Sequence, residues 1–369
     1  MADQPPAGQC ATVAVPVDNN FPDDDDTYSS EIESYATSVS SSVMNYHWQY
    51  GRRYHAFKEG SYKFPNDERE QDRLDMLHNM FRLVLNGKLF LAPIKDGPLR
   101  VLDIGTGTGI WAIDFADEFP SAQEVLLQSH YKRQGLKGSD YGQRPESYTT
   151  AVVRSPFSLN TVLPSRTRLL NYLRVPPNVI FEVDDVESEW PPRAPFDFIH
   201  SRYMCGSIED WPRLAQQAYS QLRPGGWIEF QEFHLVNYSE DGSLKEGNNV
   251  NRFYELLREA LDKINRPVTI GKDLERIVKE AGFVNVHHEV FQLPLGTWPR
   301  ERRMKEIGAL NMLQMLDGLE AFSAATFTNI LGWTIEEVQV FLALVRKDAR
   351  DRGVHMMHDF HVVYAQKPS

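Results

Sequence analysis

An acidic residue followed by three alternate glycines is the part of this chain whose residue types point most directly to chemistry. Asp103 ends an apolar run, and Gly105, Gly107 and Gly109 follow it. The apolar run predicts a buried parallel strand, and the residues after Gly109 have helical spacing, so the glycines occupy a strand-to-helix turn. Such turns are where α/β sheets bind ligands. Glycines there allow close approach of the backbone and expose amide groups at a helix N-terminus, which favours an anionic group such as a carboxylate.

The spacing of these glycines separates the ligand classes that use such a turn. The dinucleotide fingerprint needs its third glycine where this chain has Ile110, and the Gly-Lys-Ser/Thr end of a phosphate-binding P-loop is missing. The spacing therefore favours a methyltransferase that binds S-adenosylmethionine. Two alternatives stay open: another nucleotide-binding fold, and a tight turn with a purely structural role.

Strands and helices alternate along the rest of the chain. An apolar helical stripe covers residues 74–85 after a candidate N-cap at Asn66, and Asp210 is the candidate N-cap of a later helix. Further helices are expected at residues 250–264 and 274–278. The expected strands lie at residues 178–185, 196–200, 227–232, 283–293 and 360–364. This alternation predicts an α/β fold with a doubly wound, mostly parallel sheet.

Composition divides the chain into regions. Residues 1–42 are rich in acidic residues and serine, which predicts a disordered tail. Residues 43–98 are expected to form an N-terminal helical cap, and residues 99–369 the ligand-binding domain. Within that domain, a segment at about residues 300–352 is rich in Leu, Met and Phe and too long for a simple connection. We expect it to be a helical cap over the substrate side.

Charge and cysteine content exclude several classes of function. The net charge of −12 and the pI near 5.4 argue against direct nucleic-acid binding, which needs a basic face. Two cysteines, Cys10 and Cys205, are too few for a disulfide framework or a zinc site and favour a reducing compartment. No metal-ligand pattern is present. There is neither a signal-peptide pattern nor an apolar run of membrane-spanning length, so we expect a cytoplasmic or nuclear protein that is not secreted.

Several motifs taken together resemble one family, the class I S-adenosylmethionine-dependent methyltransferases, and within it the fungal LaeA-like (TAM-domain) group. The resemblance covers about residues 45–123 and 175–367. Its motifs are the glycine turn and residues 45–57, 65–74, 176–187, 196–211 and 222–232. The resemblance implies a Rossmann-like sheet with helical cap segments and S-adenosyl-L-methionine as cofactor.

The resemblance also implies roles for individual residues. Asp103 is expected to bind the amino-acid end of the cofactor beside the three glycines. Asp185 is expected to accept a hydrogen bond from the adenine amine, with its neighbour Asp184 as the alternative. Both acids also have structural interpretations, as a turn cap and as a surface acid. Trp111 fits a position beside the cofactor and a position in the core equally well.

Methyl transfer requires mainly that donor and acceptor be placed correctly, and a general base is needed only when the acceptor atom starts protonated. His200 and Glu232, which follow expected strand ends, are weak candidates for that base, as opposed to structural residues. Arg202 and Tyr203 lie in the same region. Four residues near the N-terminus have two possible roles, closure over the cofactor or formation of an aromatic packing cluster. They are Tyr50, Arg53, Tyr54 and His55.

Residues 124–174 depart from the family pattern. The family would place there a second strand that ends in an acid for the ribose hydroxyls, but His130 follows the apolar residues 125–127, and Asp140 is a distant substitute. The segment has eight basic residues against three acidic ones, a net charge of +5. Three interpretations stay open. The segment is an insertion that serves a partner, a loop that delivers Asp140 to the ribose, or a mistranslated stretch such as read-through of non-coding sequence or a frame error. The composition favours the last, which places the activity of this exact chain in doubt.

Two classes of function follow from the resemblance. One is an enzyme that methylates N, O or C of a fungal secondary metabolite, with a small-molecule or peptidic acceptor. The other is a LaeA-like nuclear regulator of secondary metabolism that acts with velvet-type protein partners. A catalytically silent homologue is the third alternative. None of these functions involves direct nucleic-acid binding or a membrane.

Overall fold

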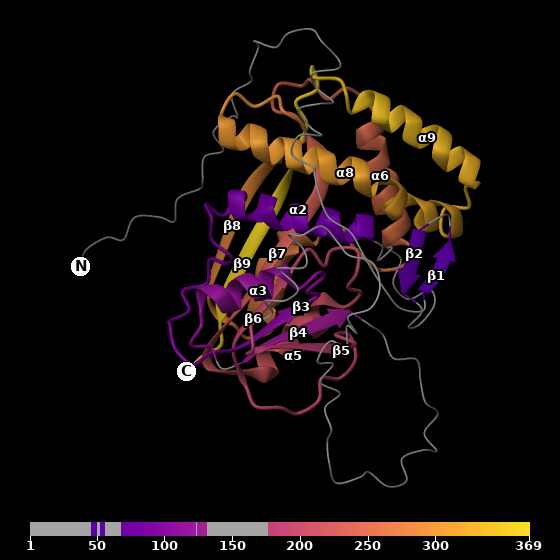
Figure 1. Cartoon of the computed structure of the whole chain (residues 1–369). Helices are drawn as coiled ribbons and strands as arrows, with labels where there is room; N and C mark the ends of the chain where they lie inside the picture. The colour runs from indigo at the N-terminus through magenta and orange to yellow at the C-terminus, as the bar shows by residue number, and fades with distance from the viewer. Residues whose placement is uncertain (1–45, 50–51, 56–67, 123, 131–175) are drawn as a thin grey trace, which may run out of the picture.

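Seven strands form a mixed sheet whose spatial order differs from the chain order. The computed structural model describes residues 46–49, 52–55, 68–122, 124–130 and 176–369 (Figure 1). The order across the sheet is β5-β4-β3-β6-β7-β9-β8. The first five strands are mutually parallel, and β9 is antiparallel to both β7 and β8. The strands are β3 (Arg100–Ile104), β4 (Glu124–His130), β5 (Val179–Asp184), β6 (Phe196–Arg202), β7 (Leu222–Tyr238), β8 (Val284–Pro294) and β9 (Met357–Gln366). The predicted α/β, Rossmann-like fold is confirmed.

The two central strands β3 and β6 are almost completely buried, as their apolar sequences predict. Their parallel register places Asp103 directly beside His200. The strand order reverses at this pair, because β4 lies on one side of β3 and the later strand β6 on the other. Doubly wound sheets bind ligands in the crevice outside the carboxyl ends of the strands at such a reversal.

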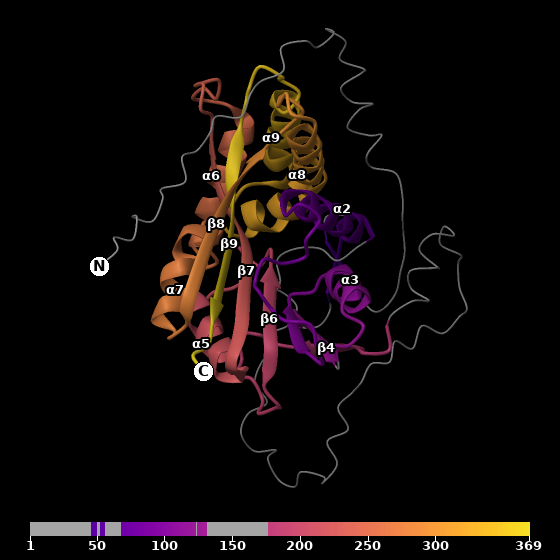
Figure 2. The ribbon, with the colours of Figure 1, turned by 90° about the vertical axis from the view of Figure 1, so that its left-hand side faces the viewer.

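Helices cover both faces of the sheet. In Figure 2, α2 and α3 lie on one side of the strands, and α5 and α7 on the other. A third group, α6, α8 and α9, packs together at one end of the sheet (Figure 1). The helices are α2 (Glu68–Val84), α3 (Ile110–Glu118), α5 (Trp211–Gln221), α6 (Asn249–Asp262), α7 (Leu274–Glu280), α8 (Arg302–Asn329) and α9 (Ile335–Asp348). In the described part of the chain, none of them is both long and apolar enough to cross a bilayer.

Local sequence signals fix several helix starts. The Asp210 carboxylate accepts a hydrogen bond from Arg213 N at 2.9 Å, so the predicted N-cap of α5 is confirmed. Thr334 and Glu337 form a reciprocal capping box at the start of α9. The segment at 300–352, expected to be helical, contains α8 and α9.

Two regions contain strands outside the expected alternation of strands and helices, although the apolar residues 125–127 are a candidate for a remnant strand. Within residues 43–98, a two-stranded antiparallel hairpin, β1 (Tyr46–Gln49) and β2 (Arg52–His55), precedes α2. The first seven residues of the segment 124–174 form β4, which pairs with β3 and β5 and so belongs to the sheet. The predicted tail 1–42 and the single residues Asn66 and Asp140 lie outside the described residues.

Candidate functional site

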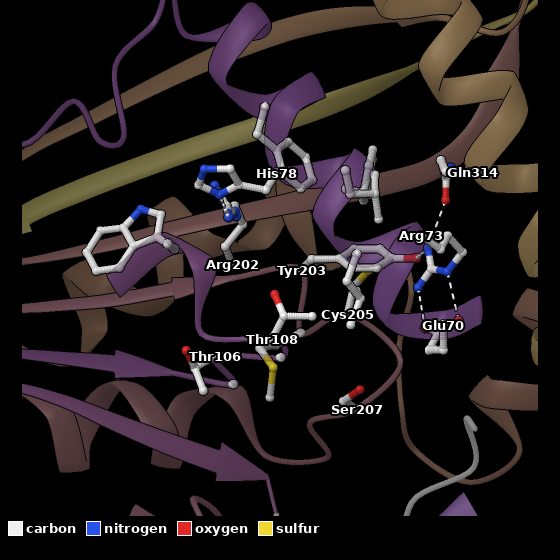
Figure 3. A pocket seen from close by; sticks show the side chains of 18 of the residues that line it. Glu70, Arg73, His78, Thr106, Thr108, Arg202, Tyr203, Cys205, Ser207 and Gln314 are labelled. Atoms are coloured by element: carbon white, nitrogen blue, oxygen red, sulfur yellow. Dashed lines mark hydrogen bonds and ion pairs between the residues drawn. The ribbon is translucent and has the colours of Figure 1, made fainter. Parts of the chain in front are cut away.

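A cavity opens at the carboxyl ends of β3 and β6, beside the strand-to-helix turn. Its walls come from that turn, from α2, α6 and α8, and from residues that follow β6. In Figure 3, Tyr203 lies between Arg202 and His78 on one side and Glu70, Arg73 and Gln314 on the other. The residues that define the glycine-turn side are Asp103, Thr106, His200 and Arg202. The residues that define the α2–α8 side are Glu70, Arg73, Gln314 and Phe322.

Each of the three glycines has a positive φ, of 72° at Gly105, 56° at Gly107 and 80° at Gly109. Side chains are strained in this backbone region, so the turn requires glycine. Gly105 and Gly107 also line the cavity. A Cβ atom at Gly105 would overlap the thioether of Met204. Gly109 is the N-cap residue of α3 and does not line the cavity, so its contribution is to the turn itself.

Asp103 and His200 form a buried pair at the base of the cavity. Asp103 Oδ1 lies 2.7 Å from His200 Nδ1, and the exposed fractions of the two residues are 2% and 0%. Burial lowers the pKa of His200, which keeps the imidazole neutral at pH 7. Asp103 Oδ2 and His200 Nε2 are buried and have no hydrogen-bond partner among the described residues. Asp103 therefore has an acceptor available to a ligand.

Arg202 presents the complementary donor. Its Nη2 lies 2.9 Å from His78 Nδ1, and His78 Nε2 lies 3.0 Å from Asp114 Oδ2. Burial lowers the pKa of His78 to about 4, so the ring is neutral, donates to Asp114 and accepts from Arg202. The pKa of Arg202 is lowered to about 10 by burial, and the guanidinium remains charged at pH 7. Its Nη1 is buried without a partner in the described part of the chain.

These two groups match one kind of ligand. Asp103 Oδ2 can only accept a hydrogen bond, and Arg202 Nη1 can only donate one. A buried polar atom without a hydrogen bond is costly, so Asp103 Oδ2 and Arg202 Nη1 each gain from a hydrogen bond to a ligand group of opposite charge. A ligand with an ammonium and a carboxylate on one carbon, such as an amino acid, would satisfy both. Thr106 adds a third buried and unpartnered polar atom, Oγ1.

The α2–α8 side has a different character because its charges are already paired. Arg73 donates to both carboxylate oxygens of Glu70, from Nε at 2.9 Å and from Nη2 at 2.5 Å. Its Nη1 donates to Gln314 Oε1 at 3.0 Å and to the hydroxyl of Tyr203 at 3.3 Å. Burial raises the pKa of Tyr203 to about 12, so the phenol is neutral. A ligand on this side therefore meets polar groups without a net charge.

Two predicted residues, Glu232 and Asp185, do not line the cavity. Glu232 is buried and accepts hydrogen bonds from the backbone N–H groups of Met204 and Cys205, at 2.8 to 3.0 Å. Asp185 accepts from the backbone N–H of Glu187 at 3.0 Å and from Ser188 Oγ at 2.7 Å. The side chain of Asp184 and residue Tyr50 lie outside the described residues, as do the side chains of Arg53, Tyr54 and His55.

Sequence reasoning missed the polar residues that α2 contributes. Glu70, Arg73 and His78 line the cavity from the same face as Leu74, Leu77 and Phe81, since all follow three- and four-residue spacing. The signal that could have revealed them is the presence of three charged or polar residues on an otherwise apolar helix face. Gln314 carries no comparable signal, because the sequence around it is an ordinary helical stretch.

Comparisons with known proteins agree with this geometry. Residues 76–288 match the family model described as "Methyltransferase domain". Methyltransferase pytC of Aspergillus terreus is 43% identical over 350 residues, which cover 95% of this chain and 97% of the relative. The probable methyltransferase tdiE of Emericella nidulans is 33% identical over 90% of this chain and 93% of its own length. The secondary metabolism regulator LAE1 of Cochliobolus heterostrophus is 32% identical over 86% of this chain and 94% of its own. The chain therefore belongs to the methyltransferase family and is an S-adenosylmethionine-dependent methyltransferase.

Proposed function

We propose that this enzyme methylates a small-molecule acceptor of secondary metabolism, and that the glycine-turn side of the cavity holds the methionine end of S-adenosylmethionine. One observation carries the cofactor assignment: Asp103 Oδ2 and Arg202 Nη1 are buried, unpartnered in the described part of the chain, and opposite in charge. The ammonium of the cofactor pairs with Asp103 and its carboxylate with Arg202. Gly105 and Gly107 let the backbone approach the ligand closely.

His200 acts as a positioning residue in this proposal. Its ring is fully buried, and its Nδ1 is engaged by Asp103 Oδ1, which leaves Oδ2 directed to the ligand. Its lowered pKa makes it a poor proton acceptor at neutral pH. Glu232 has a structural role, because its carboxyl oxygens accept hydrogen bonds from the backbone at Met204 and Cys205. Asp185 stays the predicted acceptor for the adenine amine.

When bound, S-adenosylmethionine supplies a methyl group on a positively charged sulfur, and the electron pair of the breaking S–CH3 bond stays on that sulfur as the acceptor atom bonds to the methyl carbon. The protein's part is to bind, orient and exclude water. Residues of α2, α6 and α8 line the space opposite the glycine turn. The acceptor is therefore assigned to that space.

The alternative is a regulator that acts in the nucleus with velvet-type protein partners. Relatives that are named secondary metabolism regulators support the regulatory part of this alternative. The cavity and the higher identity to the methyltransferase pytC favour the enzyme. The low cysteine content supports a cytoplasmic or nuclear location.

Titration calorimetry with two ligands tests the cofactor assignment. S-Adenosylhomocysteine has the amino-acid end, and 5′-methylthioadenosine lacks it. We expect Asp103→Asn and Arg202→Gln each to weaken S-adenosylhomocysteine binding about tenfold or more, because each removes a hydrogen bond to a charged group. Binding of 5′-methylthioadenosine should be unchanged.

Asp197→Asn is the control, since Asp197 is a buried aspartate at the opposite end of β6 that bonds to Arg100 N and Arg223. It should leave both affinities unchanged. Equal losses for the two ligands in the Asp103 and Arg202 variants would contradict the assignment, because the loss would then be unrelated to the amino-acid end.

A further inference from the structure

Tyr203 is held in an unusual backbone conformation at the centre of the cavity. Its φ is +59°, and the three other described non-glycine residues with positive φ are all asparagines, which tolerate this region. The backbone around it is fixed by β7: Tyr203 N donates to the carbonyl of Gln231 at 3.0 Å, and the next two amides donate to Glu232. Strained residues of this kind are found at functional sites.

The phenol of Tyr203 is fixed in direction as well. Its ring meets Phe233 edge to face, with centroids 5.1 Å apart, and the Arg73 guanidinium lies 5.5 Å from its centroid. Arg73 Nη1 donates to its oxygen, so the O–H is left to donate to a ligand. Figure 3 shows this hydroxyl pointing towards Arg73, while Arg202 lies on the other side of the Tyr203 ring.

The α2–α8 side has no uncompensated charge among the described residues. The Arg73 guanidinium is neutralised by Glu70, and four hydrogen bonds engage it. The thiol of Cys205 is neutral, because burial raises its pKa well above the ordinary value. An anionic acceptor would lose its hydration here without gaining a free cation. An uncharged acceptor has no such cost.

The remaining walls of this side are apolar and partly aromatic. They are formed by Phe233, Leu235, Tyr254, Leu257, Leu261 and Phe322. Surfaces of this kind bind flat apolar molecules, and a few placed polar groups fix their orientation.

From these observations we propose that the α2–α8 side binds the methyl acceptor as an uncharged, mainly apolar ring compound, with the Tyr203 hydroxyl donating a hydrogen bond to an oxygen of that compound. The inference rests on the proposed function, which gives the glycine-turn side to the methyl donor. Tyr203 is a residue that binds and orients the acceptor. It takes no proton from it.

A matched pair of probes tests the proposal on the full chain saturated with S-adenosylhomocysteine. 2-Naphthol is an uncharged bicyclic compound with an oxygen acceptor, and 2-naphthoate presents a carboxylate on the same ring system. Calorimetry at pH 7.5 should show 2-naphthol binding at least ten times more tightly than 2-naphthoate. Tyr203→Phe should weaken 2-naphthol binding about three- to tenfold, the effect of one neutral hydrogen bond.

Tyr238→Phe is the control variant, because Tyr238 donates to Asp359 away from the cavity. It should not change either affinity. Tighter binding of 2-naphthoate, an unchanged 2-naphthol affinity in Tyr203→Phe, or no binding of either probe would overturn the proposal. S-Adenosylhomocysteine is titrated first. If it does not bind the folded natural chain, the cofactor assignment is refuted instead. If Tyr203→Phe binds S-adenosylhomocysteine as tightly as the natural chain does, the variant is folded.

Discussion

The imidazole of His200 lies parallel to the indole of Trp111, with ring centroids 3.8 Å apart and 3° between the ring planes. Trp111 is itself fixed by a hydrogen bond from its Nε1 to the carbonyl of Leu89, at 3.1 Å. His200 is thus held between an immobile aromatic face and the Asp103 carboxylate. The orientation of Asp103 therefore depends on two residues of β6 and α3 rather than on the glycine turn alone.

His200→Phe separates a positioning role from a catalytic one. The variant keeps a flat ring against Trp111 and removes Nδ1, so Asp103 loses its hydrogen-bond donor. We expect S-adenosylhomocysteine affinity to fall about tenfold, since hydrogen bonds to charged groups contribute about 1.5–3 kcal/mol. Calorimetry measures this. His287→Phe, in which an exposed histidine stacked on Tyr364 is replaced, is the control. Full affinity combined with lost turnover would identify His200 as a catalytic base instead.

Gly105→Ala should damage both the fold and the site. The added methyl group meets the thioether of Met204, and the φ of 72° strains any side chain. We expect a loss of about 1–3 kcal/mol in the free energy of unfolding, measured by urea denaturation, and loss of S-adenosylhomocysteine binding. Met204→Ala in the same chain should restore part of the stability, because it removes the steric overlap but not the backbone strain. Equal stability of the single and double variants would show that the overlap is unimportant.

Protonation of His78 should destabilise the protein in acid. Its pKa is about 4 in the folded protein and about 6.5 in the unfolded chain, so the unfolded state binds the proton more readily. The contribution of the neutral ring to stability is complete above pH 6.5 and is lost as the pH falls from 6.5 to 4, by about 3 kcal/mol in total. Urea denaturation across this range should show a smaller pH dependence for His78→Gln than for the natural chain. Parallel curves would refute the role of His78.

Glu232 should produce the opposite pH dependence. Burial raises its pKa to about 8, far above the ordinary value for a glutamate, so the folded protein favours the protonated form. Its stabilising contribution is present below the unfolded pKa of about 4.3 and is lost as the pH rises through 8. Glu232→Gln should remove this decline in the free energy of unfolding between pH 6 and 9. A decline identical to that of the natural chain would assign it to other groups.

The features that could be predicted from the sequence are those defined by residues close together along the chain. The N-cap at Asp210 and the turn after Asp103 were found because short spacings define them. The resemblance to class I methyltransferases of the LaeA-like group is confirmed by the family match and by the relatives. The α/β fold could also be predicted, because segments with strand periodicity and segments with helix periodicity alternate along the chain.

The contacts that shape the cavity could not be predicted in the same way. Arg73 and Gln314 are 241 positions apart, and Asp103 and His200 are 97 positions apart. Only the packing of α2 against α8 and the parallel register of β3 and β6 bring them together. His200 and Tyr203 were expected near strand ends, but their partners depend on this packing.

The position of β9 has a consequence for how the enzyme is made. This strand lies between β7 and β8, although it follows both of them along the chain. While the polypeptide is being synthesised, β7 and β8 are therefore available before the strand that joins them. Each then presents unpaired backbone N–H and C=O groups, which are a template for pairing with other chains. This side of the sheet can therefore close only after Met357–Gln366 has left the ribosome.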